Sequence, residues 1–189
     1  PERFLLYVGA TLPHKNLGNM LRGFSGALKQ PGREDLFLVM AGRESRFERD
    51  WLDLAERLEI TERIRRVGYV GQEDLPGLYK RAAALLYVSC YEGFGFPPLE
   101  AMEHGLPVIA SSHSSLPEVV GSAGLFVDPD DVQGIAEAIG KVLDDPGLRR
   151  RLRAKGKKNL ERFSWRNAAG KTLEVYERLL GQDNGRESC

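Results

Sequence analysis

Residues 84–100, ALLYVSCYEGFGFPPLE, join a short apolar run to a glycine-rich loop and then to two prolines. The run 84–88 is typical of a strand covered on both faces, and Pro97 and Pro98 suit a first helical turn, whose amides need no internal partner. A loop after a parallel strand lies at the carboxyl edge of the sheet, where open α/β sheets bind ligands. The segment therefore predicts a strand-to-helix unit that carries a binding loop.

The same alternation of strand and helix runs through most of the chain. Strands are expected over 4–8, 36–41, 64–70, 84–88, 108–111 and 125–127. Amphipathic helical patterns separate most of them, the clearest over 16–29, and the chain after Asp128 is helical only, over 132–143, 146–162 and 165–180. This order predicts parallel strands joined by right-handed crossovers. We expect an α/β, Rossmann-like, doubly wound sheet of about six strands with C-terminal helices.

Bulk properties narrow the class of protein. The 189 residues, 42% of them hydrophobic, suffice for one well-filled domain but not for two large ones. Basic and acidic residues balance at 27 each, so no net field favours nucleic acid as a partner. With two cysteines, no signal-peptide pattern and no apolar stretch of membrane-spanning length, we expect a cytoplasmic protein, at most peripheral on the membrane. The chain opens on Pro1 without an initiator Met, so we expect a piece of a longer protein, with one domain over 1–181 and a polar tail over 182–189.

Two carboxylates bracket the loop, and their spacing suits a polyol. Glu100 is expected in the first turn of the following helix, where the positive end of the helix dipole stabilises a carboxylate that can accept two hydrogen bonds from a vicinal diol such as ribose. Glu92, still in the loop, is free to reach a second sugar, and Gly93 and Gly95 let backbone amides approach closely. A plain glycine turn before an acidic helix start would give the same letters.

Other segments offer weaker signals. Lys15 follows the first strand beside a competent N-cap, Asn16, and suits a diphosphate, although a solvated loop lysine explains it more simply. The turn 68–71 could present backbone groups to a base or be an ordinary turn. Residues 128–130 match a D-x-D metal pattern, but Pro129 and the following Asp131 fit an N-cap and a helix entry better. The three histidines lack metal-ligand spacing, so no metal is expected. The basic run 149–158 could lie on a membrane, but a packed helix with a solvated cationic face is favoured.

Five segments in order resemble the carboxyl-terminal domain of group 1 (family 4) retaining glycosyltransferases, which have the GT-B architecture. They are 7–9 with 13–16, 39–42, 92–100 as E-x7-E, 105–110 and 116–119. The resemblance covers 4–180. It implies that this half holds a nucleotide-sugar donor, while an amino-terminal half, absent from this sequence, shapes the site for a glycan or lipid-linked acceptor. The last helix resembles the one that crosses back toward that half.

The resemblance also assigns roles to residues. It implies that Glu100 binds the donor ribose, Glu92 the hydroxyls of the transferred sugar and Lys15 the diphosphate, while Tyr69 and Val70 bracket the base. It implies metal-independent transfer with retention, without a cofactor, in which Glu92 and Lys15 take part. The expected donor-binding set is Gly9, Lys15, Arg43, Tyr69, Val70, Glu92, Gly93, Phe94, Gly95, Glu100 and Ser114.

Two features depart from the family pattern. Many relatives carry an arginine where this chain has Ala10, and we expect Arg43 to substitute for it. Relatives often show two glycines where this chain has Ser114 and Ser115. Residues 114–118 of this chain, together with residues 13–16, resemble those of members that use GDP-mannose. The alternatives to a hexosyltransferase are a nucleotide-sugar epimerase of the same architecture and a non-catalytic nucleotide-sugar-binding module.

Overall fold

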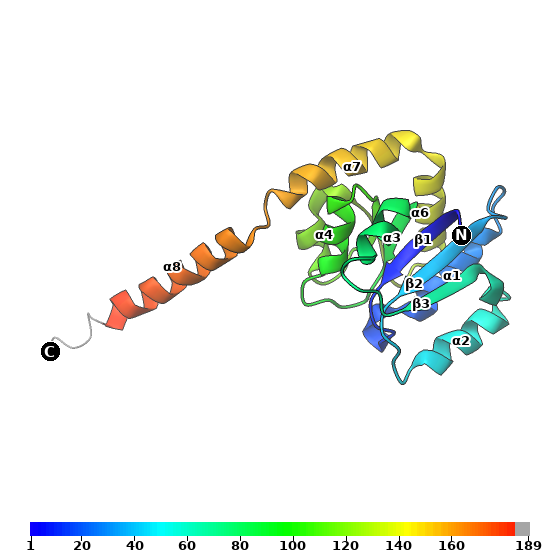
Figure 1. Ribbon diagram of the computed structural model, residues 1–189, viewed down its shortest axis with the longest axis horizontal. Helices are drawn as coiled ribbons and strands as arrows, with labels where there is room; N and C mark the ends of the chain where they lie inside the picture. Colours follow the sequence, from blue (N-terminus) through cyan, green and yellow to red (C-terminus); the bar gives the residue numbers. More distant parts are fainter. Residues whose placement is uncertain (184–189) are drawn as a thin grey trace.

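The computed structural model describes residues 1–183 and contains one six-stranded parallel sheet (Figure 1). The strands are β1 (Arg3–Val8), β2 (Leu36–Ala41), β3 (Ile64–Gly68), β4 (Ala84–Tyr87), β5 (Val108–Ser111) and β6 (Gly124–Val127). Their order is β3-β2-β1-β4-β5-β6, so the winding direction reverses between β1 and β4. The expected doubly wound α/β fold is confirmed, and its switch point, where such folds bind ligands, lies between these two strands.

Eight α-helices and three 3-10 turns connect or follow the strands in the described part of the chain. They are η1 (Pro13–Lys15), α1 (Leu17–Leu28), α2 (Glu48–Arg57), η2 (Thr61–Arg63), α3 (Leu75–Arg81), α4 (Phe96–Glu103), α5 (Leu116–Val120), η3 (Gly121–Ala123), α6 (Val132–Asp144), α7 (Pro146–Leu160) and α8 (Trp165–Asp183). Residues 184–189, most of the expected tail, lie outside the described residues.

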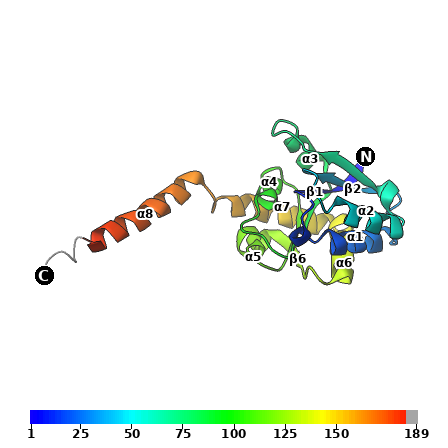
Figure 2. The same ribbon diagram turned by 90° about the horizontal axis from the view of Figure 1, so that it is seen from below.

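Two apolar layers hold the sheet. On one face, α1, α2 and α6 contribute Phe24, Trp51 and Ile139 to a buried cluster, and on the other face α3, α4 and α5 contribute residues such as Tyr79 and Met102 (Figure 2). Full burial of one such large side chain stabilises the fold by about 1.5–3 kcal/mol. The apolar runs of β1, β2, β4 and β5 follow from this double cover, whereas the edge strand β3 exposes Arg65 and Arg66 to water.

Two expected boundaries near the site are wrong by a few residues. The third strand ends at Gly68, whose φ of +68° turns the chain, so Tyr69 and Val70 lie in the following loop. Helix α4 begins at Phe96 after Gly95, so Glu100 is its fifth residue and lies beyond the first turn. The helix dipole therefore acts on this carboxylate more weakly than the sequence suggested.

The two last helices behave differently. The buried side of α7 includes Leu152 and Asn159, whose amide donates to the Val119 carbonyl at 2.9 Å, while most of its basic side chains are exposed. The packed helix with a solvated cationic face is thus confirmed. Helix α8 extends away from the sheet domain, and Trp165 at its start is 82% exposed (Figures 1 and 2). Within residues 1–183, no helix is long and apolar enough to cross a membrane.

Candidate functional site

An ion pair lies at the switch point of the sheet. Lys15 is the last residue of η1, after β1, and Glu92 lies in the loop after β4. The Lys15 Nζ is 2.7 Å from Oε1 and 2.9 Å from Oε2 of Glu92, and the two side chains are only 13% and 9% exposed. The structure therefore brings together the two groups to which the family resemblance assigns the diphosphate and the transferred sugar.

Buried tyrosines surround this pair. The Lys15 Nζ donates to the Tyr87 hydroxyl at 3.1 Å and lies 5.2 Å from the centre of its ring. The Tyr7 hydroxyl donates to the Ala10 carbonyl at 2.8 Å and so closes the loop after β1. Burial, followed by the negative charge of Glu92, raises the pKa of both phenols, so both stay neutral.

Glu92 stays ionised although it is partly buried. Burial alone would raise the pKa of its carboxyl, but hydrogen bonds, first among them that of Lys15, together with the charge of Lys15, outweigh it and lower the pKa. The site therefore holds a carboxylate and an ammonium side by side at neutral pH.

Serine hydroxyls from the loop after β5 hold the Glu92 loop. The Ser114 hydroxyl donates to the Glu92 carbonyl at 2.7 Å and accepts from the Glu92 amide at 3.1 Å. The Ser115 hydroxyl lies 2.9 Å from the same carbonyl and 2.8 Å from that of Phe94. Ser114, expected among the donor-binding residues, is thus engaged by the loop backbone.

Gly95 completes the loop at a position where a side chain would be strained. Its φ is +104°, and a Cβ there would lie 2.8 Å from Cδ2 of Leu116. This backbone conformation is rare for residues with a side chain. Gly93 has open space around it instead, and Phe94 packs against Phe96 and Phe163 with ring centres 4.9 Å and 5.9 Å away.

Glu100 has a partner that sequence reasoning missed. The Tyr79 hydroxyl, from α3, donates to Oε2 of Glu100 at 2.6 Å. Tyr87 belongs to the apolar run 84–88, and neither Tyr87 nor Tyr79 is among the residues that the sequence predicts for the site. The available signal was chemical, because a buried phenol normally needs a hydrogen-bond partner.

The other expected residues lie along the β1 to β3 part of the same edge. The Gly9 amide donates to the Ala41 carbonyl at 2.9 Å and joins the ends of β1 and β2. The Arg43 guanidinium lies over the ring of Tyr69, 5.1 Å from its centre, and Tyr69 is 66% exposed. Val70 packs partly buried against the apolar layer of α3 to α5. Arg43 is therefore placed with Tyr69, where the sequence expected the base.

The segments expected to cap helices do so in part. Asp131 caps α6 by accepting from the Gly134 amide at 2.8 Å, as expected, and Asp128 accepts from the Asp130 amide at 2.9 Å. Asn16 sits at the N-cap position of α1, but its side chain makes no cap bond and donates instead to the carbonyls of Val88 and Pro129. The N-cap role expected for Asn16 is therefore wrong, because this amide ties the loop after β1 to those after β4 and β6. In residues 1–183, no group of three His, Cys, Asp or Glu side chains could hold a metal ion.

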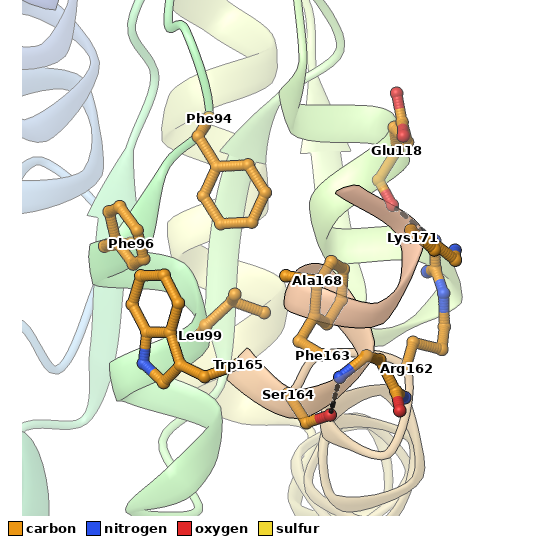
Figure 3. A pocket seen from close by; sticks show the side chains of 11 residues that line it. Phe94, Phe96, Leu99, Glu118, Arg162, Phe163, Ser164, Trp165, Ala168 and Lys171 are labelled. Atoms are coloured by element: carbon orange, nitrogen blue, oxygen red, sulfur yellow. Dashed lines mark hydrogen bonds between the residues drawn. The ribbon is translucent and has the colours of Figure 1, made fainter. Parts of the chain in front are cut away.

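A hollow adjoins the Glu92 loop at Phe94 and Phe96. Its volume is about 780 Å³. Figure 3 shows the aromatic side chains of Phe94, Phe96 and Trp165 along it. Ser164, another residue that lines the pocket, accepts a hydrogen bond from the Asn167 amide at 3.1 Å, just before α8 begins. The loop thus carries Glu92 of the ion pair and, two and four residues later, two aromatic side chains that line this pocket.

Comparison with known proteins identifies the family. The family model described as glycosyl transferases group 1 matches residues 1–159. This chain belongs to that family. The O-antigen chain mannosyltransferase B of Escherichia coli is 41% identical over 179 residues, which are 94% of this chain and 46% of that protein. Sucrose-phosphate synthase from Thermosynechococcus elongatus superposes with a TM-score of 0.82 at 28% identity, over 96% of this chain and 46% of that one.

The comparisons also place the chain within the family architecture. The C-terminal domain of a glycosyl transferase group 1 family protein from Francisella tularensis superposes with a TM-score of 0.73 at 22% identity, over 84% of each chain. The fold is that of a GT-B carboxyl-terminal domain, and this group 1 chain spans about half the length of the curated mannosyltransferase above. These relatives do not favour an epimerase or a binding module.

Proposed function

We propose that residues 1–181 are the nucleotide-sugar-binding domain of a retaining hexosyltransferase that transfers mannose from GDP-mannose to a glycan or lipid-linked acceptor. The observation that carries the proposal is the direct contact between Lys15 and Glu92 at the β1/β4 switch point. Glu92 lies on the loop that leads to Glu100 in α4. A cation for a diphosphate and carboxylates for sugar hydroxyls are the groups that a nucleotide-sugar requires.

In the proposed reaction, Lys15 stabilises the departing nucleoside diphosphate as negative charge develops on it. Helix α4 gives limited help, because Pro97 and Pro98 remove two of the four amides that its start would otherwise offer. Glu92 binds hydroxyls of the transferred sugar, and Glu100 binds the ribose. We assign no side chain as a covalent nucleophile and propose that acceptor attack and departure occur on one face of the sugar, without cofactor or metal.

The choice of mannose and guanine rests on similarity. The Escherichia coli relative is named a mannosyltransferase, and the Ser114-Ser115 pair replaces the glycines common in the family. Arg43 and Tyr69 together offer a cation and an aromatic face to the base. We place the whole protein in the cytoplasm, with peripheral membrane contact where the acceptor is lipid-linked.

Calorimetric titration of the chain with GDP-mannose, UDP-glucose and ADP-glucose tests the proposal. We expect GDP-mannose to bind most tightly, and Lys15→Met and Glu100→Gln to weaken its binding, while the exposed Lys155→Met matches the first change in charge and should have no effect. Turnover is expected only from the full-length protein, because half of the GT-B cleft lies outside this chain. A folded chain that binds none of the three sugars would contradict the donor-site assignment.

A further inference from the structure

The contact between Tyr79 and Glu100 joins two elements far apart in the chain. Tyr79 lies in α3 and is 2% exposed, and its hydroxyl is 2.6 Å from Oε2 of Glu100 in α4. Burial and the hydrogen bond to the carboxylate raise the pKa of this phenol, which therefore keeps its proton and acts as the donor. Hydrogen bonds to charged acceptors are shorter and stronger than neutral ones, and this short distance is typical of them.

Tyr79 is itself held rigidly. Its ring packs in the apolar layer that contains Leu85 and Met102, and it stacks on His104 with ring centres 5.7 Å apart and an interplanar angle of 25°. A tyrosine fixed in this way has little freedom to follow the carboxylate. The carboxylate must instead adopt the orientation that the phenol imposes.

The contact leaves one side of the carboxylate for a ligand. Glu100 is half-buried, and Oε1 has no hydrogen-bond partner among residues 1–183. A carboxylate has about four lone-pair sites on its two oxygens, so fixing Oε2 on one side sets the plane in which Oε1 accepts. A diol is bound more tightly by such a fixed carboxylate than by a freely rotating side chain, because less orientational freedom is lost on binding. A 2′-deoxyribose lacks one of the two hydroxyls and gains less from the fixed orientation, so the site discriminates between the two sugars.

We propose that Tyr79 is the positioning residue that aims Glu100 at the ribose diol and thereby sets the preference of the site for ribonucleotides over 2′-deoxyribonucleotides. The proposal rests on the function proposed above, because it assumes that Glu100 meets the ribose. The phenol touches only the carboxylate, so its effect reaches the nucleotide through Glu100.

The test compares dissociation constants for GDP and 2′-deoxy-GDP, with UDP and 2′-deoxy-UDP as a second pair, by calorimetry. The wild type should prefer the ribonucleotide, and Tyr79→Phe, which removes only the hydroxyl, should weaken ribonucleotide binding about tenfold while changing deoxynucleotide binding little. The matched control is Tyr7→Phe, another buried tyrosine, whose hydroxyl binds the Ala10 carbonyl. It should leave the ratio between the two sugars unchanged, whatever it does to overall affinity.

A double-mutant cycle separates positioning from packing. Glu100→Gln should itself bring the dissociation constants of ribonucleotide and deoxyribonucleotide closer together. Adding Tyr79→Phe to that variant should change their ratio little further, because the two residues act through one contact. A merely structural role of Tyr79 would lower both affinities equally and leave the ratio intact. If Tyr79→Phe does not fold, 3-fluorotyrosine at position 79 keeps the shape and makes the phenol a stronger donor, and the ratio should widen.

The outcomes distinguish the two proposals. A wild type that binds none of the four nucleotides overturns the proposed function. The role of Tyr79 alone is overturned if the wild type prefers ribonucleotides and a folded Tyr79→Phe or fluorotyrosine variant shows the same ratio of dissociation constants as the wild type.

Discussion

The Lys15–Glu92 pair makes a quantitative prediction about the ligand-free protein. Removing one partner of a buried ion pair costs about 3–5 kcal/mol, because the other charge stays buried without compensation. In Glu92→Gln the ammonium keeps the amide oxygen and the Tyr87 hydroxyl, 3.1 Å away, as acceptors. We therefore expect the low end, about 3 kcal/mol of unfolding free energy, or about 6–12 °C in Tm for a domain of this size.

Thermal and urea unfolding of four proteins measure this value. They are the wild type, Glu92→Gln, Lys15→Met and the double variant. Because each single variant strands the partner left behind, the double variant should lose clearly less than the sum of the two. GDP should stabilise Glu92→Gln, since its diphosphate replaces the lost negative charge beside Lys15. Single variants within about 1 kcal/mol of the wild type, or a double variant that loses the full sum, would refute the reasoning.

Three further predictions concern the same loop. Folding lowers the pKa of Glu92, so the ionised carboxylate stabilises the fold fully above the ordinary carboxyl range and loses this effect as the pH falls through the lowered value. In urea unfolding, the difference in unfolding free energy between the wild type and Glu92→Gln should therefore shrink from pH 7 to pH 3. Gly95→Ala should cost about 1–3 kcal/mol in the same assay, because its φ is strained for alanine and its Cβ meets Leu116; full stability would count against the described loop. Ser114→Ala should cost about 1 kcal/mol and speed hydrogen exchange at the Glu92 amide, whereas unchanged exchange would show that this hydroxyl does not hold the loop.

The sequence was sufficient for the fold because local pattern and burial agree. Except for the edge strand β3, which carries Arg65 and Arg66, the strands of this sheet are apolar runs or nearly so, and the helices between them carry apolar stripes, so period and order predict the doubly wound topology. Boundaries were less certain where one backbone angle decides them. Gly68 ends β3 through its positive φ, and no periodicity in neighbouring residues signals that angle.

Side-chain partners depend on tertiary contacts that a sequence pattern does not contain. The expected parallel sheet implies that the loops carrying Lys15 and Glu92 share its carboxyl edge, but not that the two charges touch. The bond from Tyr79 to Glu100 crosses from α3 to α4, and neither residue's neighbours in sequence indicate it. Asn16 is a residue type that often caps helices, but its side chain instead makes two hydrogen bonds to the distant carbonyls of Val88 and Pro129.

The exposure of α8 has a consequence for the behaviour of this chain in solution. Leu173, Tyr176, Leu179 and Leu180 are each more than half exposed, and together they make one side of the helix apolar toward water. Contiguous apolar surface of this kind promotes association between molecules, and a net charge of zero provides no repulsion to oppose it. The chain should therefore associate more strongly as its concentration rises and less strongly when the apolar side of α8 is covered. This behaviour does not depend on the free energy of unfolding of the sheet domain.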